Sequence, residues 1–158
     1  YMKSLKILSL VAVMLMTLVG CKDPDDGGNH GGGNTTGSLE GIEKEWELVS
    51  VNGTPNEFSV YISFDLGMFS MYQQVYSLDF KLYEGEYSIS GNKITGSYFE
   101  GGDWKCAYVG SVSEDGNTLT LKSDEENAIV CVYKACTIPQ QVKDEAFGTR
   151  AVDVVPFL

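Results

Sequence analysis

Thiols are the most reactive side chains in this sequence, which contains four cysteines: Cys21, Cys106, Cys131 and Cys136. Metal sites and redox pairs often use cysteines in C-x-x-C spacing, and none of the four has such a neighbour. If the chain is exported, the three besides Cys21 leave at least one thiol free or bridged to another chain. The thiols therefore predict neither a metal site nor a redox centre.

Acid–base catalysis has few candidates. The one histidine, His30, lies in a glycine-rich stretch that offers no metal partner at a fixed distance. The remaining chain therefore lacks the commonest general base. Asp124, Glu125 and Glu126 are carboxylates of the kind that cleave glycosides, but their place in an expected hairpin loop favours a solvated turn. No glycine-rich phosphate loop opens a helix, so we expect no enzyme, no cofactor and no metal.

The charge balance excludes one class of partner. The 158 residues include 11 Lys and Arg against 22 Asp and Glu, a formal charge of −11. Nucleic-acid binding needs a basic surface, so we expect no nucleic-acid partner. A hydrophobic fraction of 43% suffices for one domain with a core, and 9 tyrosines and 7 phenylalanines suit half-buried strands.

The start of the chain has the features of an export signal. Lys3 and Lys6 precede an apolar run of roughly a dozen residues, which is short for a permanent membrane span. The run ends in Leu18-Val19-Gly20-Cys21, which resembles the lipobox of bacterial lipoproteins. The resemblance implies that residues 1–20 are a lipoprotein signal peptide and that Cys21 is acylated. The alternative is an ordinary secretory signal followed by an incidental cysteine.

Residues 21–40 are expected to form a flexible, lipidated linker, because Gly, Asn and Asp dominate and no apolar residue between Cys21 and Ser38 could anchor it. Lys22-Asp23-Pro24-Asp25-Asp26 resembles the acidic patch of surface-exported lipoproteins of Bacteroidetes; a solvated spacer is the alternative. The implied location is the outer membrane, with exposure at the cell surface. Acyl chains would be the link to the membrane, since so acidic a surface does not bind anionic lipids.

A hairpin is specified over residues 85–98. Gly91-Asn92 is a two-residue turn of the kind that tolerates positive φ. Pairing outward from this turn sets Ile89 opposite Ile94, Tyr87 opposite Gly96, and Gly85 opposite Tyr98. We expect all three pairs on one inward face, with a tyrosine ring covering a glycine in two of them.

Similar short alternating patterns continue from Glu45 to Lys134 at roughly 8–12-residue spacing, which is typical of an all-β protein. The residues expected inside include Trp46, Leu48, Phe58, Val60, Ile62, Phe64, Phe69, Met71, Leu78, Phe80, Leu82, Trp104, Cys106, Tyr108, Gly110, Val112, Leu119 and Leu121. We count about eight strands and expect an antiparallel up-and-down barrel over residues 41–142, followed by a short tail, 143–158.

Some details of this barrel depend on phase, that is, on which alternate residues of each strand point inward. Because Leu78, Phe80 and Leu82 are out of phase with Tyr87, a bulge near Glu84-Gly85 is expected. Pairing Leu121 with Val130 would point Cys131 outward, which disfavours a Cys106–Cys131 disulfide unless the last hairpin slips by one residue. The stretch from Thr137 to Val142 is expected to lead into one or two helical turns. The apolar end, Val152–Leu158, should dock against the barrel or add at an edge.

The barrel region resembles the small lipocalin-like (calycin-like) lipoproteins of Bacteroidetes. The resemblance lies in Trp46 to Gly53 (WELVSVNG), Val60 to Asp65 (VYISFD), Tyr87 to Gly96 (YSISGNKITG), Glu114 to Leu121 (EDGNTLTL) and Ile138-Pro139. It implies an eight-stranded barrel with an internal cavity for a small apolar ligand. True lipocalins carry Gly two residues before the first-strand tryptophan, where this chain has Lys44. They also stack an arginine there; Arg150 could cover Trp46 by a cation–π contact or stay unpaired.

Two functions follow from these expectations. In the first, the barrel binds a small apolar ligand in a cavity lined by Trp46, Val60, Ile62, Tyr87, Trp104 and Tyr108. The alternative for these residues is a filled core, since eight-stranded barrels can be packed solid. In the second, a packed barrel is an interaction module for a protein, a glycan or a protease. Exposed loop aromatics, Phe99 or a rim-located Trp104, would favour the second.

Overall fold

The computed structural model describes residues 37–75, 77–147 and 155–158. The predicted signal peptide 1–20, Cys21, His30 and Arg150 lie outside these residues, as does most of the predicted linker. Within the described ranges, no helix is both long enough and apolar enough to cross a membrane.

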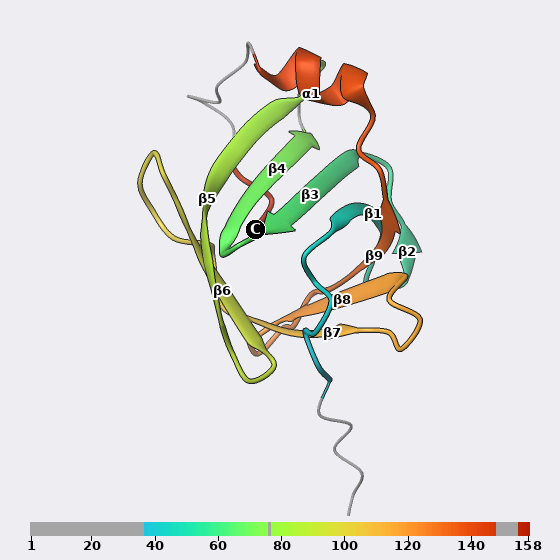
Figure 1. Ribbon diagram of the computed structural model, residues 1–158, viewed down its shortest axis with the longest axis vertical. Helices are drawn as coiled ribbons and strands as arrows, with labels where there is room; N and C mark the ends of the chain where they lie inside the picture. Colours follow the sequence, from blue (N-terminus) through green and yellow to red (C-terminus); the bar gives the residue numbers. More distant parts are fainter. Residues whose placement is uncertain (1–36, 76, 148–154) are drawn as a thin grey trace, which may run out of the picture. The chain divides into compact units, whose positions relative to one another are not determined.

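The fold is an antiparallel sheet that closes on itself (Figure 1). Its strands are β1 (Glu45–Val51), β2 (Thr54–Pro55), β3 (Ser59–Asp65), β4 (Met68–Gln74), β5 (Lys81–Ser90), β6 (Lys93–Tyr98), β7 (Tyr108–Val112), β8 (Thr118–Ser123) and β9 (Val130–Cys136), followed by helix α1 (Gln140–Phe147). Strand order follows the chain from β3 to β9, and β1 closes the ring by pairing with both β3 and β9. The predicted all-β, up-and-down barrel is confirmed, with β2 as a two-residue addition at the end of β1.

The tight turns set the registers that the sequence predicted. Ile89 pairs with Ile94, Tyr87 with Gly96 and Gly85 with Tyr98, and Gly91 has a φ of +64°. Ile94 is completely buried, but Ile89 is 42% exposed, so its predicted inward place is wrong. The β5–β6 hairpin extends past the core, and its tip therefore has no interior to face.

The ring that covers Gly96 also differs from the expected one. A Cβ atom at Gly96 would lie 2.3 Å from the ring of Trp104, so the aromatic cover is this tryptophan and not Tyr87. Trp104 is 5% exposed and precedes β7 instead of forming part of it. The absence of a side chain at Gly96 lets an indole from an irregular segment pack onto β6.

Strand β5 keeps one phase along its whole length, so the bulge expected near Glu84-Gly85 is wrong. Tyr83, Gly85 and Tyr87 face inward, and Leu82 faces outward. The predicted inward positions of Phe80 and Leu82 are wrong. Both residues pack with Val142 of α1 in a second apolar cluster, outside the main core. Leu78 was also expected inside and is 91% exposed.

The last hairpin is one residue out of the expected register. Leu121 pairs with Cys131, and Lys122 with Val130, so Cys131 points inward and is 2% exposed. The connecting loop is fixed by hydrogen bonds between Ser123 and Ile129, in which the Ile129 amide donates to Ser123 Oγ at 2.7 Å. Cys106, Cys131 and Cys136 are all free thiols.

One end of the barrel, called here the closed end, is covered by residues 38–44. Leu39 packs where a side chain at Gly110 would otherwise stand. The indole Nε1 of Trp46 donates to the Ile42 carbonyl at 2.8 Å, and Lys44 Nζ donates to the Gly116 carbonyl at 2.8 Å. Lys44 also lies 5.9 Å from the Trp46 ring centroid, in the position considered for Arg150.

The β3–β4 turn offers a test of local strain. Leu66 has a φ of +47° and is 81% exposed, a conformation that disfavours leucine, whereas Asn-Gly is the preferred pair in such turns. We expect Leu66→Asn to raise the free energy of unfolding by about 0.5–1 kcal/mol in urea titrations. Leu78→Asn, at another highly exposed leucine without positive φ, is the control. An equal change in both variants would contradict the strain.

Candidate functional site

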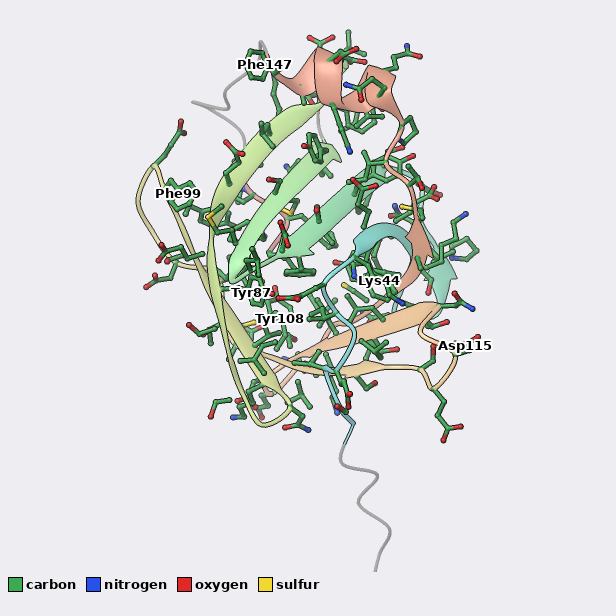
Figure 2. The ribbon with its side chains drawn as sticks, viewed as in Figure 1. Lys44, Tyr87, Phe99, Tyr108, Asp115 and Phe147 are labelled. Carbon is green, nitrogen blue, oxygen red and sulfur yellow. The ribbon has the colours of Figure 1, made fainter. Side chains whose placement is uncertain are left out.

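The six residues predicted to line a ligand cavity all lie in the core. Trp46 and Ile62 are fully buried, Val60 is 1% exposed, Trp104 and Tyr108 are 5% exposed, and Tyr87 is 9% exposed. Figure 2 shows Tyr87 and Tyr108 pointing to the interior. The structure thus brings the six together in one apolar cluster.

Aromatic contacts fill the centre of this cluster. The rings of Phe64 and Tyr87 meet edge to face at 5.0 Å, and Trp104 contacts Phe69 at 5.1 Å and Tyr108 at 6.0 Å. Tyr133 lies fully buried in the same core. The middle of the barrel is therefore occupied by side chains, and space for a ligand has to be sought at its ends or on its outside.

The end opposite residues 38–44, called here the mouth, is capped by residues 155–158. Leu158 is 2% exposed, and Phe157 packs edge to face on Phe58 at 5.8 Å. The Tyr98 hydroxyl donates to the Leu158 carbonyl at 2.8 Å. The predicted docking of the apolar end is confirmed for these four residues, and residues 152–154 lie outside the described ones.

A pocket of about 320 Å³ lies at the mouth, between the barrel rim and the docked segment. Its walls are mainly apolar and come from Val51, Phe58, Val75 and Ile129, with Tyr108 at its inner side. Of the six predicted ligand-binding residues, Tyr108 lines this mouth pocket. Trp104 lines a different hollow, on the β5–β6 hairpin.

The tyrosine hydroxyls and the Cys131 thiol at the mouth are neutral. Burial raises the pKa of the Cys131 thiol to about 11. Burial also raises the pKa of the Tyr98, Tyr108 and Tyr133 hydroxyls, and the Tyr133 hydroxyl is buried without a hydrogen-bond partner. A protonated thiol is a weak nucleophile. The pocket therefore offers hydrogen-bonding groups without charge, while Lys105 and Glu125 also border it.

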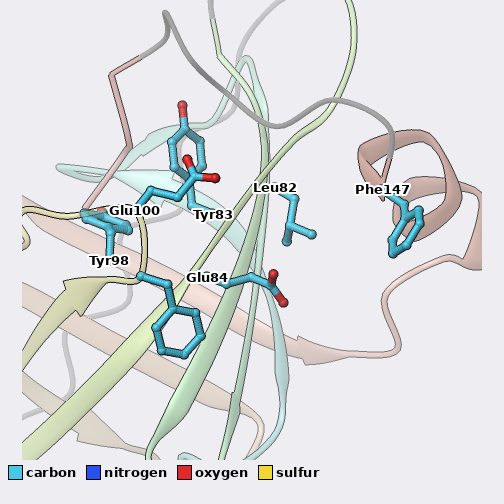
Figure 3. A pocket seen from close by; sticks show the side chains of 7 residues that line it. Leu82, Tyr83, Glu84, Tyr98, Glu100 and Phe147 are labelled. Carbon is cyan, nitrogen blue, oxygen red and sulfur yellow. The ribbon is translucent and has the colours of Figure 1, made fainter.

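A second hollow, called here the outer groove, lies between β5, the segment after β6 and the end of α1 (Figure 3). It measures about 350 Å³ and is lined by Leu82, Tyr83, Glu84, Tyr98, Phe99, Glu100 and Phe147. Phe99 is 59% exposed and Phe147 is 84% exposed. Phe99 is thus an exposed loop aromatic as considered from the sequence, whereas Trp104 is buried and not at the rim.

Sequence reasoning missed Gln73, which lies on β4 and is fully buried at the mouth. Its side chain forms two hydrogen bonds with the docked segment, to the Val155 carbonyl at 3.1 Å and from the Phe157 amide at 2.7 Å. The signal was present in the alternation, because Phe69, Met71 and Gln73 share the inward phase. A polar residue at an inward position marks a place where hydrogen bonding replaces packing.

The closed antiparallel ring, with one covered end and one mouth, defines a lipocalin-like barrel. A family model of the lipocalin-like domain matches residues 42–121, about half of the chain, and the chain belongs to this family. Among solved structures it is similar to a lipocalin-like protein from Bacteroides uniformis ATCC 8492, with 18% identity and a TM-score of 0.46, covering 61% of this chain and 99% of the other. None of the curated proteins matches the sequence.

The burial of Cys131 predicts a specific pattern of thiol labelling. In a chain carrying Cys21→Ser, we expect Cys131 to resist a thiol reagent near pH 8 and to react only as the pH approaches about 11, because the raised pKa keeps the thiol protonated. Cys106, which is only half-buried, should react faster. Mass spectrometry of labelled peptides measures both. Equal labelling of the two at pH 8 would contradict the buried position of Cys131.

Proposed function

We propose that the chain is a non-enzymatic binding protein that takes a small apolar ligand at the mouth. The observation that carries the proposal is the mouth pocket, whose volume of about 320 Å³ falls in the range of small-molecule sites. Its apolar walls would cover the body of a ligand by the hydrophobic effect. The fold supports this role, since lipocalin-like barrels are suited to holding one small ligand.

The chemistry of the pocket supports binding over catalysis. Tyr108 and Cys131 remain neutral at physiological pH, because burial raises the pKa of each group. They can orient a ligand by hydrogen bonds but supply neither a base nor a thiolate. An apolar ligand with one or two polar groups fits this lining best, and Lys105 at its border can pair with an acidic one.

We further propose that acyl chains on Cys21 hold the protein at the outer membrane, with exposure at the cell surface. Leu18-Val19-Gly20-Cys21 supports this proposal. The described chain begins at Gly37, which lies close to Ser111 of β7, and the Val112 amide donates to the Ser38 carbonyl at 2.7 Å.

The outer groove favours a second candidate function, an interaction module that binds a protein or glycan. Phe99 and Phe147 are exposed aromatic side chains that line this groove together with Leu82. Exposed aromatic side chains are frequent anchors at protein interfaces. This function would leave the mouth occupied by residues 155–158 and would not require an apolar ligand.

A matched pair of isoleucines tests the ligand-binding role. Ile129 borders the mouth pocket and is 43% exposed, while Ile89 lies at the hairpin tip and is 42% exposed. We expect Ile129→Asp to weaken binding of a fluorescent fatty acid about tenfold, because the ligand would desolvate the new carboxylate. Ile89→Asp should leave the Kd unchanged.

Fluorescence titration measures both dissociation constants, and native mass spectrometry of protein purified from its host identifies any bound molecule. Failure of the unmodified chain to bind the fatty acid, together with a ligand-free native mass, would remove the first function. The outer groove would then be the remaining candidate, and Phe99→Ser would be expected to abolish capture of its partner.

The lipid anchor has its own test. In the host, Cys21→Ala should abolish incorporation of labelled palmitate and release the protein from the membrane fraction, because the acyl acceptor is gone. Cys136→Ala, which removes a thiol of the barrel, is the control and should leave both unchanged. Palmitate incorporation that persists in Cys21→Ala would contradict the anchor.

A further inference from the structure

Gln73 makes an unusual pair of contacts at the mouth. Its Oε1 accepts a hydrogen bond from the Phe157 amide at 2.7 Å, and its Nε2 donates to the Val155 carbonyl at 3.1 Å. Both halves of one fully buried side-chain amide are thus satisfied by the main chain of a single short segment. A buried glutamine is costly without such partners, so its presence requires them.

The two contacts have the pattern of a parallel β-bridge. In such a bridge, one residue donates its N–H to the carbonyl of the residue before the facing one, and its own carbonyl accepts from the amide of the residue after it. Gln73 does the same on either side of Pro156, which has no amide hydrogen and leaves no donor unpaired there. Gln73 therefore recognises peptide backbone, and it does so independently of the side chains that the segment carries.

Selectivity for apolar side chains comes from the surroundings. Phe157 packs on the edge of Phe58, and Leu158 is enclosed in the barrel core. Tyr98 and Lys105 donate to the carbonyls of Leu158 and Phe157 at 2.8 and 3.3 Å. The combination of backbone hydrogen bonds and apolar side-chain sites is how strand-like peptides are bound in general.

We propose that the mouth is a binding site for a short, extended, apolar peptide, that Gln73 is the residue that recognises its backbone, and that residues 155–158 are the occupant supplied by the chain itself. This inference rests on the proposed binding role of the mouth and narrows its ligand to a chemical class. A leucine or methionine at position 73 would fill the same space without needing a hydrogen-bonding partner, whereas the amide needs an occupant that offers both a donor and an acceptor, as a peptide backbone does.

The test displaces the internal occupant and supplies a peptide. In the full chain, Phe157→Asp with Leu158→Asp should eject the segment, since carboxylates are not tolerated in the core; the serine pair is the milder version. The probe is fluorescein-labelled Val-Pro-Phe-Leu-amide, and near-ultraviolet circular dichroism verifies the fold. We expect the ejected variant to bind the probe at least tenfold more tightly than the unmodified chain.

The contribution of Gln73 to peptide binding is measured with a second peptide that differs from the first by one methyl group, so that the protein itself stays unchanged. Methylation of the phenylalanine nitrogen removes the one hydrogen that would donate to Gln73 Oε1. We expect the methylated peptide to bind the ejected variant about tenfold more weakly, and Gln73→Met in that variant to remove the difference between the two peptides. Equal binding of the two peptides to the ejected variant, or no binding of either, would overturn the proposal.

A fluorescent fatty acid without an amide distinguishes this inference from the proposed function. If the fatty acid binds and the peptide does not, the mouth is an apolar site and the peptide inference falls alone. If neither the fatty acid nor the peptide binds, both the proposed function and the peptide inference are wrong. A dimer of the unmodified chain that the peptide disperses would support the inference, with the segment of a second copy as the occupant.

Discussion

Closure of the sheet between β1 and β9 is the constraint on which the other features depend. A closed ring has one interior, so each strand must present alternate residues to it. The register of β1 against β9 shifts between Leu48 and Ser50, which leaves Val49 outward and 41% exposed. The shift changes the phase of β1, so that Trp46 fills the core and Val51 lines the mouth pocket. The register shift in β1 thus contributes both to the packing of the core and to the mouth pocket.

Features fixed by local backbone conformation were predictable from the sequence, and features fixed by distant packing were not. The turn at Gly91 needs a positive φ, which sets the register of the β5–β6 hairpin. The inward residues in the first part of β5 could not be predicted, since both faces carry apolar residues there and Val142 of α1 covers the outer one. The last hairpin has a longer loop, and its register depends on hydrogen bonds between Ser123 and Ile129 that alternation does not reveal.

The candidate site also combines features that were predictable from the sequence with features that were not. Alternation placed Trp46, Ile62 and Tyr108 in the interior, where each is buried. The mouth is formed by a segment 84 residues away from Gln73 in the chain, and no periodic pattern encodes a contact of that span. What the sequence did contain was the polar residue itself, at an inward position in an otherwise apolar strand. The role of Gln73 depends on residues 155–158, which only the fold brings next to it.

A filled interior and a binding function are compatible in this barrel because the two ends are filled differently. Toward the closed end, large side chains of the strands, such as Phe64 and Leu119, occupy the space. At the mouth, the strands contribute Gln73, Ser123 and Cys131, and residues 155–158 complete the packing. Burial of one leucine contributes about 1.5–3 kcal/mol and each hydrogen bond about 1 kcal/mol. Two packed side chains and four hydrogen bonds thus hold the docked segment by up to about 10 kcal/mol, before the entropy lost on ordering it is subtracted.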